Sequence, residues 1–137
     1  MKKKHLLRHL TEDVYCRLGV SPVHGIGVFA IRKIEKGIDP LRSLVSHKEL
    51  SFTRDELKRL PKGVRQQIDM FCYYDDKEVL VSTMGLNTMD FAIYVNHSKT
   101  PNIRMKKDGH FEALATLKVG EELLMDYDHS FGGEHIF

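Results

Sequence analysis

Short alternations of apolar and polar residues recur along most of the chain, and this texture predicts a mostly β protein. Residues 14–18 (VYCRL) and 28–31 (VFAI) are rich in β-branched and aromatic side chains and predict two early strands. Residues 122–127 (ELLMDY) predict a late strand that is largely buried. Gly37 in IEKGI and Gly120 in LKVGEEL indicate tight turns between strands, too short to establish an internal repeat.

A β-hairpin is predicted where Asp108-Gly109 separates two alternating segments, NIRM before it and HFEALAT after it. Asp-Gly is favoured in a type I′ turn, in which both central residues have positive φ. We therefore expect a type I′ hairpin centred on these two residues.

Helical patterns are confined to the middle of the chain. Thr53 and Glu56 have capping-box spacing at the start of TRDELKRL, and Pro61 is expected to end that helix. A second short helix is predicted over residues 64–71. No linker or low-complexity tract divides the sequence, so we expect one mostly β domain (α+β by its minor helices) over residues 1–137. It would have a core over about 14–127, a helical insertion over about 46–90 and a tail over 128–137.

Composition and charge narrow the function classes without selecting one. Hydrophobic residues make up 42% and charged residues 29%, and the net charge of +2 is too balanced to favour nucleic acid as the direct ligand. The basic start, MKKKHLLRHL, is interpreted as a solvated or frayed terminus, with targeting or phosphate binding as the alternative. No apolar run approaches the roughly 18 residues of a membrane span. Cys16 and Cys72 lack disulfide or metal-site spacing, so we expect an intracellular, cytoplasmic protein.

The segment HGIGVFA contains a G-x-G-x-x-A pattern that formally matches a dinucleotide-binding fingerprint. That fingerprint requires a helix directly after the glycines, whereas Val-Phe-Ala-Ile predicts a strand here. A dinucleotide site is therefore not favoured. Gly25 and Gly27 suit either a turn entering a strand or a backbone that approaches a ligand closely.

Three segments acquire more meaning when they are read together: HGIGVFA, then YVNHSKTPN, then GEELLMDY. In order and spacing they resemble the signature segments of the SET-domain family of protein-lysine methyltransferases. The resemblance covers residues 14–127 and implies a β-clip of short sheets in which the C-terminal strand passes beneath a loop, forming a pseudoknot.

The resemblance also implies S-adenosylmethionine as cofactor, S-adenosylhomocysteine as product, and no metal. The expected cofactor-binding residues are Gly25, Ile26, Gly27, Asn96 and His97. Tyr127 is expected to stand beside the transferring methyl, and Tyr94, Tyr73 and Tyr74 are candidates for the substrate channel. Taken singly, His97 would be a turn histidine and Tyr127 a core residue.

Two residues depart from the family pattern. Lys99 stands where Cys often follows Asn-His-Ser, and Asp128 stands where Gly often follows the final Tyr. The Cys-rich, zinc-binding flanks of many members are also missing, so the chain resembles a minimal member. Closing the lysine channel would then fall to Phe131 and Phe137, or to a second copy of the chain in a homodimer.

The chemistry implied by the resemblance needs few groups. A lysine with a pKa of about 10.4 must be neutral to accept a methyl group, which costs roughly 4–5 kcal/mol at pH 7. Burial beside a cationic sulfonium lowers that cost, so no carboxylate base is required. The expected partner is a protein or peptide that carries a lysine. The alternatives are a catalytically inactive SET-fold protein-binding module and a β-rich nucleic-acid binder that uses the basic N-terminus.

Overall fold

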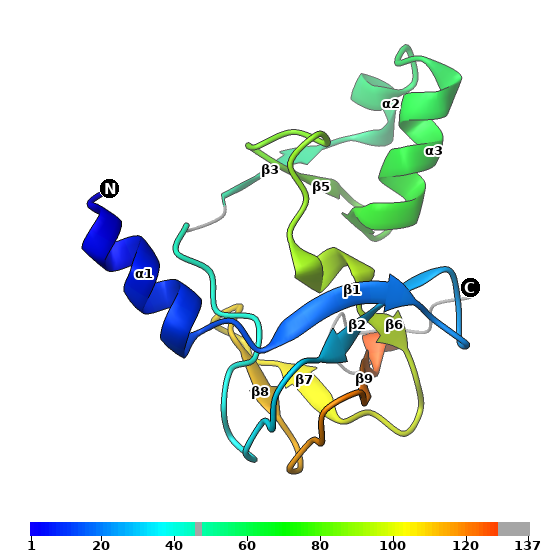
Figure 1. Cartoon of the computed structure of the whole chain (residues 1–137). Helices are drawn as coiled ribbons and strands as arrows, with labels where there is room; N and C mark the ends of the chain where they lie inside the picture. Colours follow the sequence, from blue (N-terminus) through cyan, green and yellow to red (C-terminus); the bar gives the residue numbers. More distant parts are fainter. Residues whose placement is uncertain (46–47, 129–137) are drawn as a thin grey trace. The chain divides into compact units, whose positions relative to one another are not determined.

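The computed structural model describes residues 1–45 and 48–128, which form mostly short strands in small sheets with a few helices. Two compact units are distinguished. Met1–Leu44 and the described residues from Asp90 onward make the first, and Val45–Met89 makes the second. The prediction of a mostly β fold with helices between early and late strands is confirmed for these residues (Figure 1).

The first unit is built on one six-stranded sheet. Five of its strands follow the order β1 (Cys16–Val20), β2 (Ile26–Ala30), β9 (Glu122–Met125), β7 (Ile103–Met105) and β8 (Phe111–Ala113). The sixth, β6 (Asn96–His97), follows the 3₁₀ helix η1 (Phe91–Tyr94) and pairs with β9. The strands predicted over 14–18, 28–31 and 122–127 are therefore present, with boundaries shifted by up to two residues.

Alternate residues of the central strands make the core of this unit. Val28 of β2, Leu123 of β9 and Ile103 of β7 are each 0% exposed. Burying an aliphatic side chain of this size stabilises the fold by about 1.5–3 kcal/mol. A shift of one residue in strand register would expose these side chains, so their burial fixes the register.

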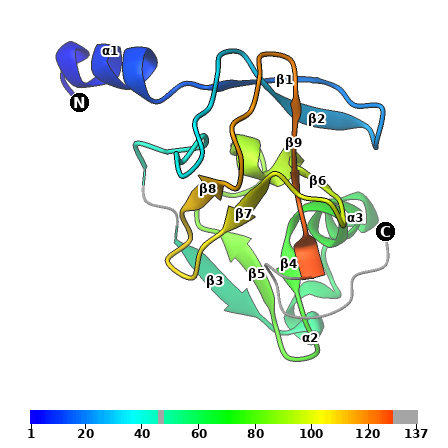
Figure 2. The same cartoon turned by 90° about the horizontal axis from the view of Figure 1, so that it is seen from below.

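Strand β9 is enclosed by the segment that joins β6 to β7. Leu123 pairs with Val28 of β2 and Met125 with His97 of β6, so both partners use the same edge of β9. On the opposite edge, the backbone of Leu124 accepts a hydrogen bond from the backbone N–H of Asn102, next to β7. Residues 98–102 therefore cross β9 from one edge to the other (Figure 2), which is the predicted C-terminal pseudoknot.

The two predicted tight turns occupy equivalent places. Ile34 and Leu117 exchange both backbone hydrogen bonds, at 3.0 and 2.8 Å. Three residues after each of them, Gly37 donates its N–H to Ala113 and Gly120 donates its N–H to Ala30, both at 2.8 Å. The two segments are too short to establish a sequence repeat, but their reciprocal hydrogen bonds relate residues 34–37 to residues 117–120 by an approximate two-fold axis.

The β7–β8 hairpin is present, but the predicted turn type is wrong. Gly109 has φ +85°, whereas no non-glycine residue of the described chain, Asp108 included, has positive φ. The loop is closed by hydrogen bonds from Lys106 N–H to the carbonyl of His110 (2.7 Å) and from Gly109 N–H to the carbonyl of Lys106 (2.9 Å). This is a three-residue loop whose last residue is left-handed. The Asp108 carboxylate instead accepts from His110 N–H.

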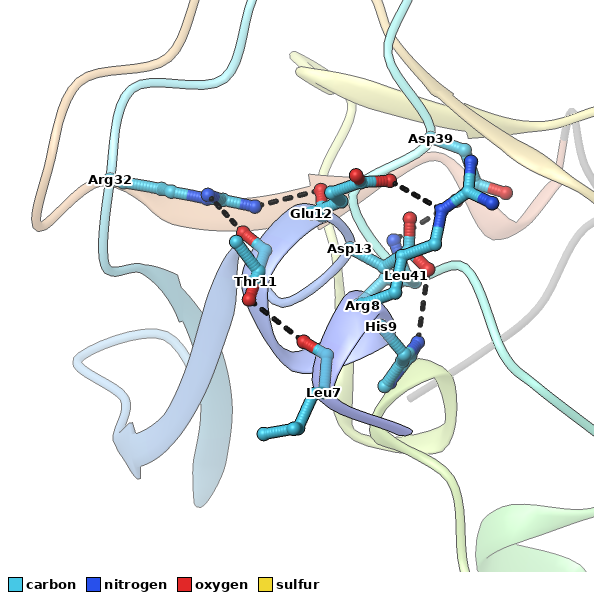
Figure 3. Close-up of polar contacts among 9 residues, drawn as sticks. All are labelled: Leu7, Arg8, His9, Thr11, Glu12, Asp13, Arg32, Asp39 and Leu41. Carbon is cyan, nitrogen blue, oxygen red and sulfur yellow. Dashed lines mark hydrogen bonds and ion pairs between the residues drawn. The ribbon is translucent and has the colours of Figure 1, made fainter. Parts of the chain in front are cut away.

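The expectation that helix is confined to the middle of the chain is also wrong. Helix α1 (Lys3–Glu12) precedes β1, although none of its residues is buried. Figure 3 shows how it is held: Arg32 donates from Nη1 to the carbonyl of Thr11 and from Nη2 to that of Glu12, at 3.0 and 2.8 Å. A cation at the last carbonyls of a helix also interacts favourably with the partial negative charge at the C-terminal end of the helix dipole. The N-terminus is thus solvated but helical.

The second unit contains the predicted helices and a separate small sheet. The sheet order is β3 (Glu49–Phe52), β5 (Val79–Ser82) and β4 (Tyr73–Tyr74). The Thr53–Glu56 capping box is present at the start of α2, which is only one turn long (Arg54–Leu57). Pro61 then caps α3 (Lys62–Phe71) rather than simply ending α2. Among the described residues, no helix is long and apolar enough to span a membrane.

Candidate active site

The glycine segment (Gly25, Ile26 and Gly27) ends the turn that follows β1 and begins β2. Ser21 begins this turn by donating its backbone N–H to the carbonyl of Gly25 at 2.8 Å. The space on the Cβ side of Gly25 is empty for at least 4 Å, so the turn has an open side. A Cβ at Gly27 would instead collide with the carboxylate of Glu122, so this position must be glycine to let that carboxylate lie against it.

Asn96 lies directly behind the glycine segment and is only 8% exposed. Its Nδ2 donates to the carbonyls of His24 (2.9 Å) and Ile26 (3.3 Å) and to Oε2 of Glu122 (3.0 Å). The structure therefore brings Asn96 and the glycine segment together across roughly 70 residues of sequence, because β6 and β2 share one edge of β9. The three acceptors around Nδ2 also fix the orientation of the amide.

Glu122 and Ser21 complete this network, and the sequence interpretation missed both. Ser21 Oγ lies 2.8 and 2.9 Å from the two carboxylate oxygens of Glu122, and it accepts from Val23 N–H and His24 N–H. Ser21 is nearly buried, at 9% exposure. Nothing in the local sequence links residues that are 101 positions apart. The sequence offered one hint, the two adjacent glutamates of GEEL. Neighbouring strand residues face opposite sides, so one of the two carboxylates would point inward and need a hydrogen-bond partner.

His97 and Tyr127 form the other half of the site. The backbone N–H of Tyr127 donates to Nδ1 of His97 at 3.0 Å, so in the neutral ring the proton is on Nε2. The two rings lie 5.3 Å apart between centroids, tilted by 58°. The Tyr127 hydroxyl donates to the carbonyl of Val95, which directly precedes Asn96. The predicted cofactor and methyl-transfer residues of the first unit therefore belong to one connected group.

Burial sets the protonation of Tyr127. It raises the pKa of the phenol to about 12, because the anion would lose hydration that its half-buried surroundings do not replace. Tyr127 is accordingly a neutral phenol at physiological pH. Its proton is directed at Val95, and donating that proton uses none of the acceptor capacity of the oxygen.

The two departures from the family pattern pair with each other. The Lys99 ammonium, in the crossing segment, makes ion pairs with Asp128 and, at 3.6 Å, with Asp126. These carboxylates raise the pKa of Lys99, Asp128 most strongly. His97, Asp126 and Asp128 have potential ligand atoms within 4.8 Å of one another, but a metal ion there would have to displace the Lys99 ammonium. The cluster is better described as an ion pair that ties the crossing segment to both neighbours of Tyr127.

The three candidate channel tyrosines lie in different places. Tyr94 ends η1 and packs, half-buried, against the core of the first unit. Tyr73 and Tyr74 form β4 in the second unit, where the Tyr73 hydroxyl donates to Asp75 (3.1 Å) and Arg54 lies over the Tyr74 ring. Phe131 and Phe137, the candidates for closing the channel, lie outside the described residues.

A family model for the SET domain matches residues 25–128, from the glycine segment to the residue after Tyr127. The chain belongs to the SET-domain family. The resemblance inferred from the three sequence segments is thereby confirmed, as is the fold class.

Two solved structures show the same fold at low sequence identity. One is a Plasmodium falciparum protein described as a candidate histone methyltransferase, 19% identical, with a TM-score of 0.53 over 87% of this chain and 97% of that one. The other is a humanized mutant of the Polycomb Repressive Complex 2 of Chaetomium thermophilum, bound to an inhibitor. It is 21% identical with a TM-score of 0.55, and the match covers 96% of this chain but 18% of that longer chain.

Proposed function

We propose that this SET domain is an S-adenosylmethionine-dependent methyltransferase acting on protein lysine side chains. The observation that carries the proposal is the connected group described above. Asn96 holds the glycine segment while the adjacent Val95 and His97 hold Tyr127, so one short strand positions both halves of the site. Membership of the SET-domain family and the methyltransferase description of one structural neighbour support it.

The polar groups of the site fit this cofactor. S-adenosylmethionine carries a cationic sulfonium and an ammonium group, and when bound it supplies an electrophilic methyl. The residues next to the glycine segment offer acceptors for such charges. No donor among residues 1–45 and 48–128 reaches Oδ1 of Asn96, and the Glu122 carboxylate lies beneath Gly27. The glycine segment, Asn96 and His97 would hold the cofactor.

The residues of the chain have two tasks in the reaction: to align the groups and to keep the acceptor lysine neutral. The hydroxyl oxygen of Tyr127 accepts weak C–H···O contacts from a polarised methyl, and its ring forms a wall of the site. A pKa of about 12 excludes Tyr127 as a base near neutrality. Burial beside a cation lowers the pKa of the acceptor ammonium, which therefore gives up its proton to water as the lysine enters the site.

Replacing Tyr127 tests this assignment. Tyr127→Phe removes the acceptor oxygen, so kcat should fall about 10- to 100-fold while the Kd for S-adenosylmethionine changes little. Tyr15→Phe is the matched control, because Tyr15 packs against the core of the same unit without belonging to the site. Full activity of Tyr127→Phe would exclude the proposed role.

The substrate is sought by incubating the purified protein with isotope-labelled S-adenosylmethionine and a cell extract, followed by mass spectrometry of modified lysines. Core histones are a reasonable first protein, given the description of the Plasmodium neighbour. Cofactor binding without any transfer would favour an inactive protein-binding module. Nucleic-acid binding that falls steeply with salt and is lost on deleting residues 1–10 would favour the third alternative.

A further inference from the structure

Glu122 is a charged group that the proposed reaction does not use. It is the first residue of β9, pairs with Phe29 of β2, and turns its carboxylate against the backbone of Gly27. Its side chain lies on the same side of the sheet as the glycine segment and Asn96. It is thus placed beneath the part of the chain assigned to the cofactor.

The negative charge of Glu122 has only neutral partners in the described structure. Ser21 Oγ donates to the carboxylate at 2.8–2.9 Å, and Asn96 Nδ2 donates at 3.0 Å. Among residues 1–45 and 48–128, no lysine, arginine or histidine makes an ion pair with it. Hydrogen bonds from neutral groups hold a carboxylate in place but leave its charge uncompensated, which is costly in a partly buried site.

The same network leaves acceptors beside the glycine segment. Asn96 uses its donor Nδ2 on two carbonyls and on Glu122, and no donor among residues 1–45 and 48–128 is bonded to its Oδ1. The Glu122 carboxylate, which lies against Gly27, gives a negative potential along the glycine segment. Such a potential favours a cation and gives nothing to a neutral ligand of the same shape.

We propose that Glu122 is a positioning residue that also makes the site select a cationic cofactor over its neutral product. It holds the glycine segment through Asn96 and Ser21, and its unbalanced charge attracts the sulfonium of S-adenosylmethionine. S-adenosylhomocysteine has the same groups except that its sulfur is an uncharged thioether. The proposal rests on the proposed function and adds a reason why product would leave more easily than substrate binds.

The test is calorimetric titration of both ligands into wild type, Glu122→Gln and Glu121→Gln. Glu122→Gln keeps the size and hydrogen-bonding shape of the side chain but removes its charge. It should weaken S-adenosylmethionine by about tenfold and S-adenosylhomocysteine much less, as expected for one charge acting across a partly buried site. Glu121→Gln makes the same change in net charge on an exposed neighbour and should leave the ratio of the two affinities unchanged.

A purely structural role for Glu122 predicts a different result, because a misplaced turn weakens both ligands equally. Ser21→Ala provides that comparison: it removes hydrogen bonds to the turn and to Glu122 without removing charge, so both affinities should fall together. An unchanged affinity ratio in Glu122→Gln would overturn the proposal.

If Glu122→Gln does not fold, the salt dependence of the wild-type affinities for the two ligands tests the proposal instead. S-adenosylmethionine should weaken more with added salt than S-adenosylhomocysteine, and equal dependence would overturn the proposal. Wild-type protein that binds neither ligand would instead exclude the proposed function.

Discussion

Tyr127 is held from three sides by alternate residues of one short stretch. Val95 accepts from its hydroxyl, His97 accepts from its backbone N–H, and Lys99 pairs with the carboxylates on either side of it. One of these contacts is made by a backbone carbonyl and the other two by side chains, so both the backbone path and the side chains of this stretch position Tyr127. The side chain with the proposed chemical role therefore owes its position to β6 and the residues after it.

The raised pKa of Tyr127 makes a prediction about alkaline pH. The folded protein holds the phenol proton up to a pKa of about 12, whereas the unfolded chain releases it near 10. The stability that Tyr127 contributes is therefore complete below pH 10 and is lost as the pH rises towards 12. The difference in unfolding free energy between wild type and Tyr127→Phe, measured with urea, should be constant up to about pH 9 and then shrink. The buried Cys16 also titrates late, but it does so in both proteins and cancels. A gap that stays constant to pH 11 would contradict the assignment.

Residue identities in the site were more predictable than residue partners. Tyr127, Asn96 and Gly25 stand out in the sequence because of their order and spacing. That Asn96 spends its amide on His24, Ile26 and Glu122 could not be foreseen, since these bonds depend on which strands become neighbours. The contribution of Ser21 was hidden for the same reason.

At the scale of elements, the crossing of β9 depends on Asn102. All four polar groups of this residue are used: its N–H and Nδ2 donate to the carbonyls of Leu124 (3.0 Å) and Glu122 (2.8 Å). Its carbonyl and Oδ1 accept from the N–H groups of Leu114 and Leu124, both at 2.8 Å. The Asn102 side chain thus makes two hydrogen bonds to the backbone of β9 that a neighbouring strand would otherwise make.

Asn102→Ala should destabilise the protein by about 2–4 kcal/mol. The change removes two side-chain hydrogen bonds and leaves a carbonyl and an N–H of β9 without their partners in a half-buried place. Chemical denaturation measures the loss. Asn87→Ala, at an exposed asparagine, is the control and should cost less than about 0.5 kcal/mol. Equal effects of the two changes would show that the bridge carries no stability.

Elements defined by local chemistry were predictable, and those defined by distant contacts were not. The capping box at Thr53 and the turn at Gly109 have their determinants within a few residues, so their positions were found even where the turn type was wrong. Helix α1 buries none of its residues, and its C-terminal anchor is Arg32, 20 positions away from Glu12. Leu6, Leu7 and Leu10 have helical spacing, but nothing near them in the sequence indicated the contact with Arg32 that holds the helix.

The first unit is closed by two turns that bond to each other's preceding strand. Gly37 donates its N–H to Ala113 of β8, the strand before the Gly120 turn, and Gly120 donates its N–H to Ala30 of β2, the strand before the Gly37 turn. Both hydrogen bonds are 2.8 Å long. Both glycines have φ +90°, a conformation that any other residue adopts only with strain. The closure therefore depends on two geometrically equivalent turns.

Gly37→Ala and Gly120→Ala should destabilise the protein by similar amounts, about 1–2 kcal/mol each, because a Cβ is disfavoured at this φ. Neither methyl would meet an atom within 4 Å, so the effect isolates the backbone. Gly63→Ala, in α3 and also without neighbours, should be neutral or stabilising by up to about 1 kcal/mol. Thermal or urea unfolding distinguishes these outcomes, and strongly unequal costs at the two turns would refute their equivalence.

The pairing of β2 with β9 also determines when the site can form during protein synthesis. Roughly 90 residues separate the two strands, so at 5–20 residues per second β2 leaves the exit tunnel about 5–20 s before β9 does. Through that interval the glycine segment has no Glu122 to lie against. Residues 98–102 emerge only about 20 residues ahead of β9 and have no strand to cross until it follows. A nascent chain of this protein therefore cannot bind its proposed cofactor in stages. The site is assembled in a single late event, when the last strand is placed under a loop made some seconds earlier.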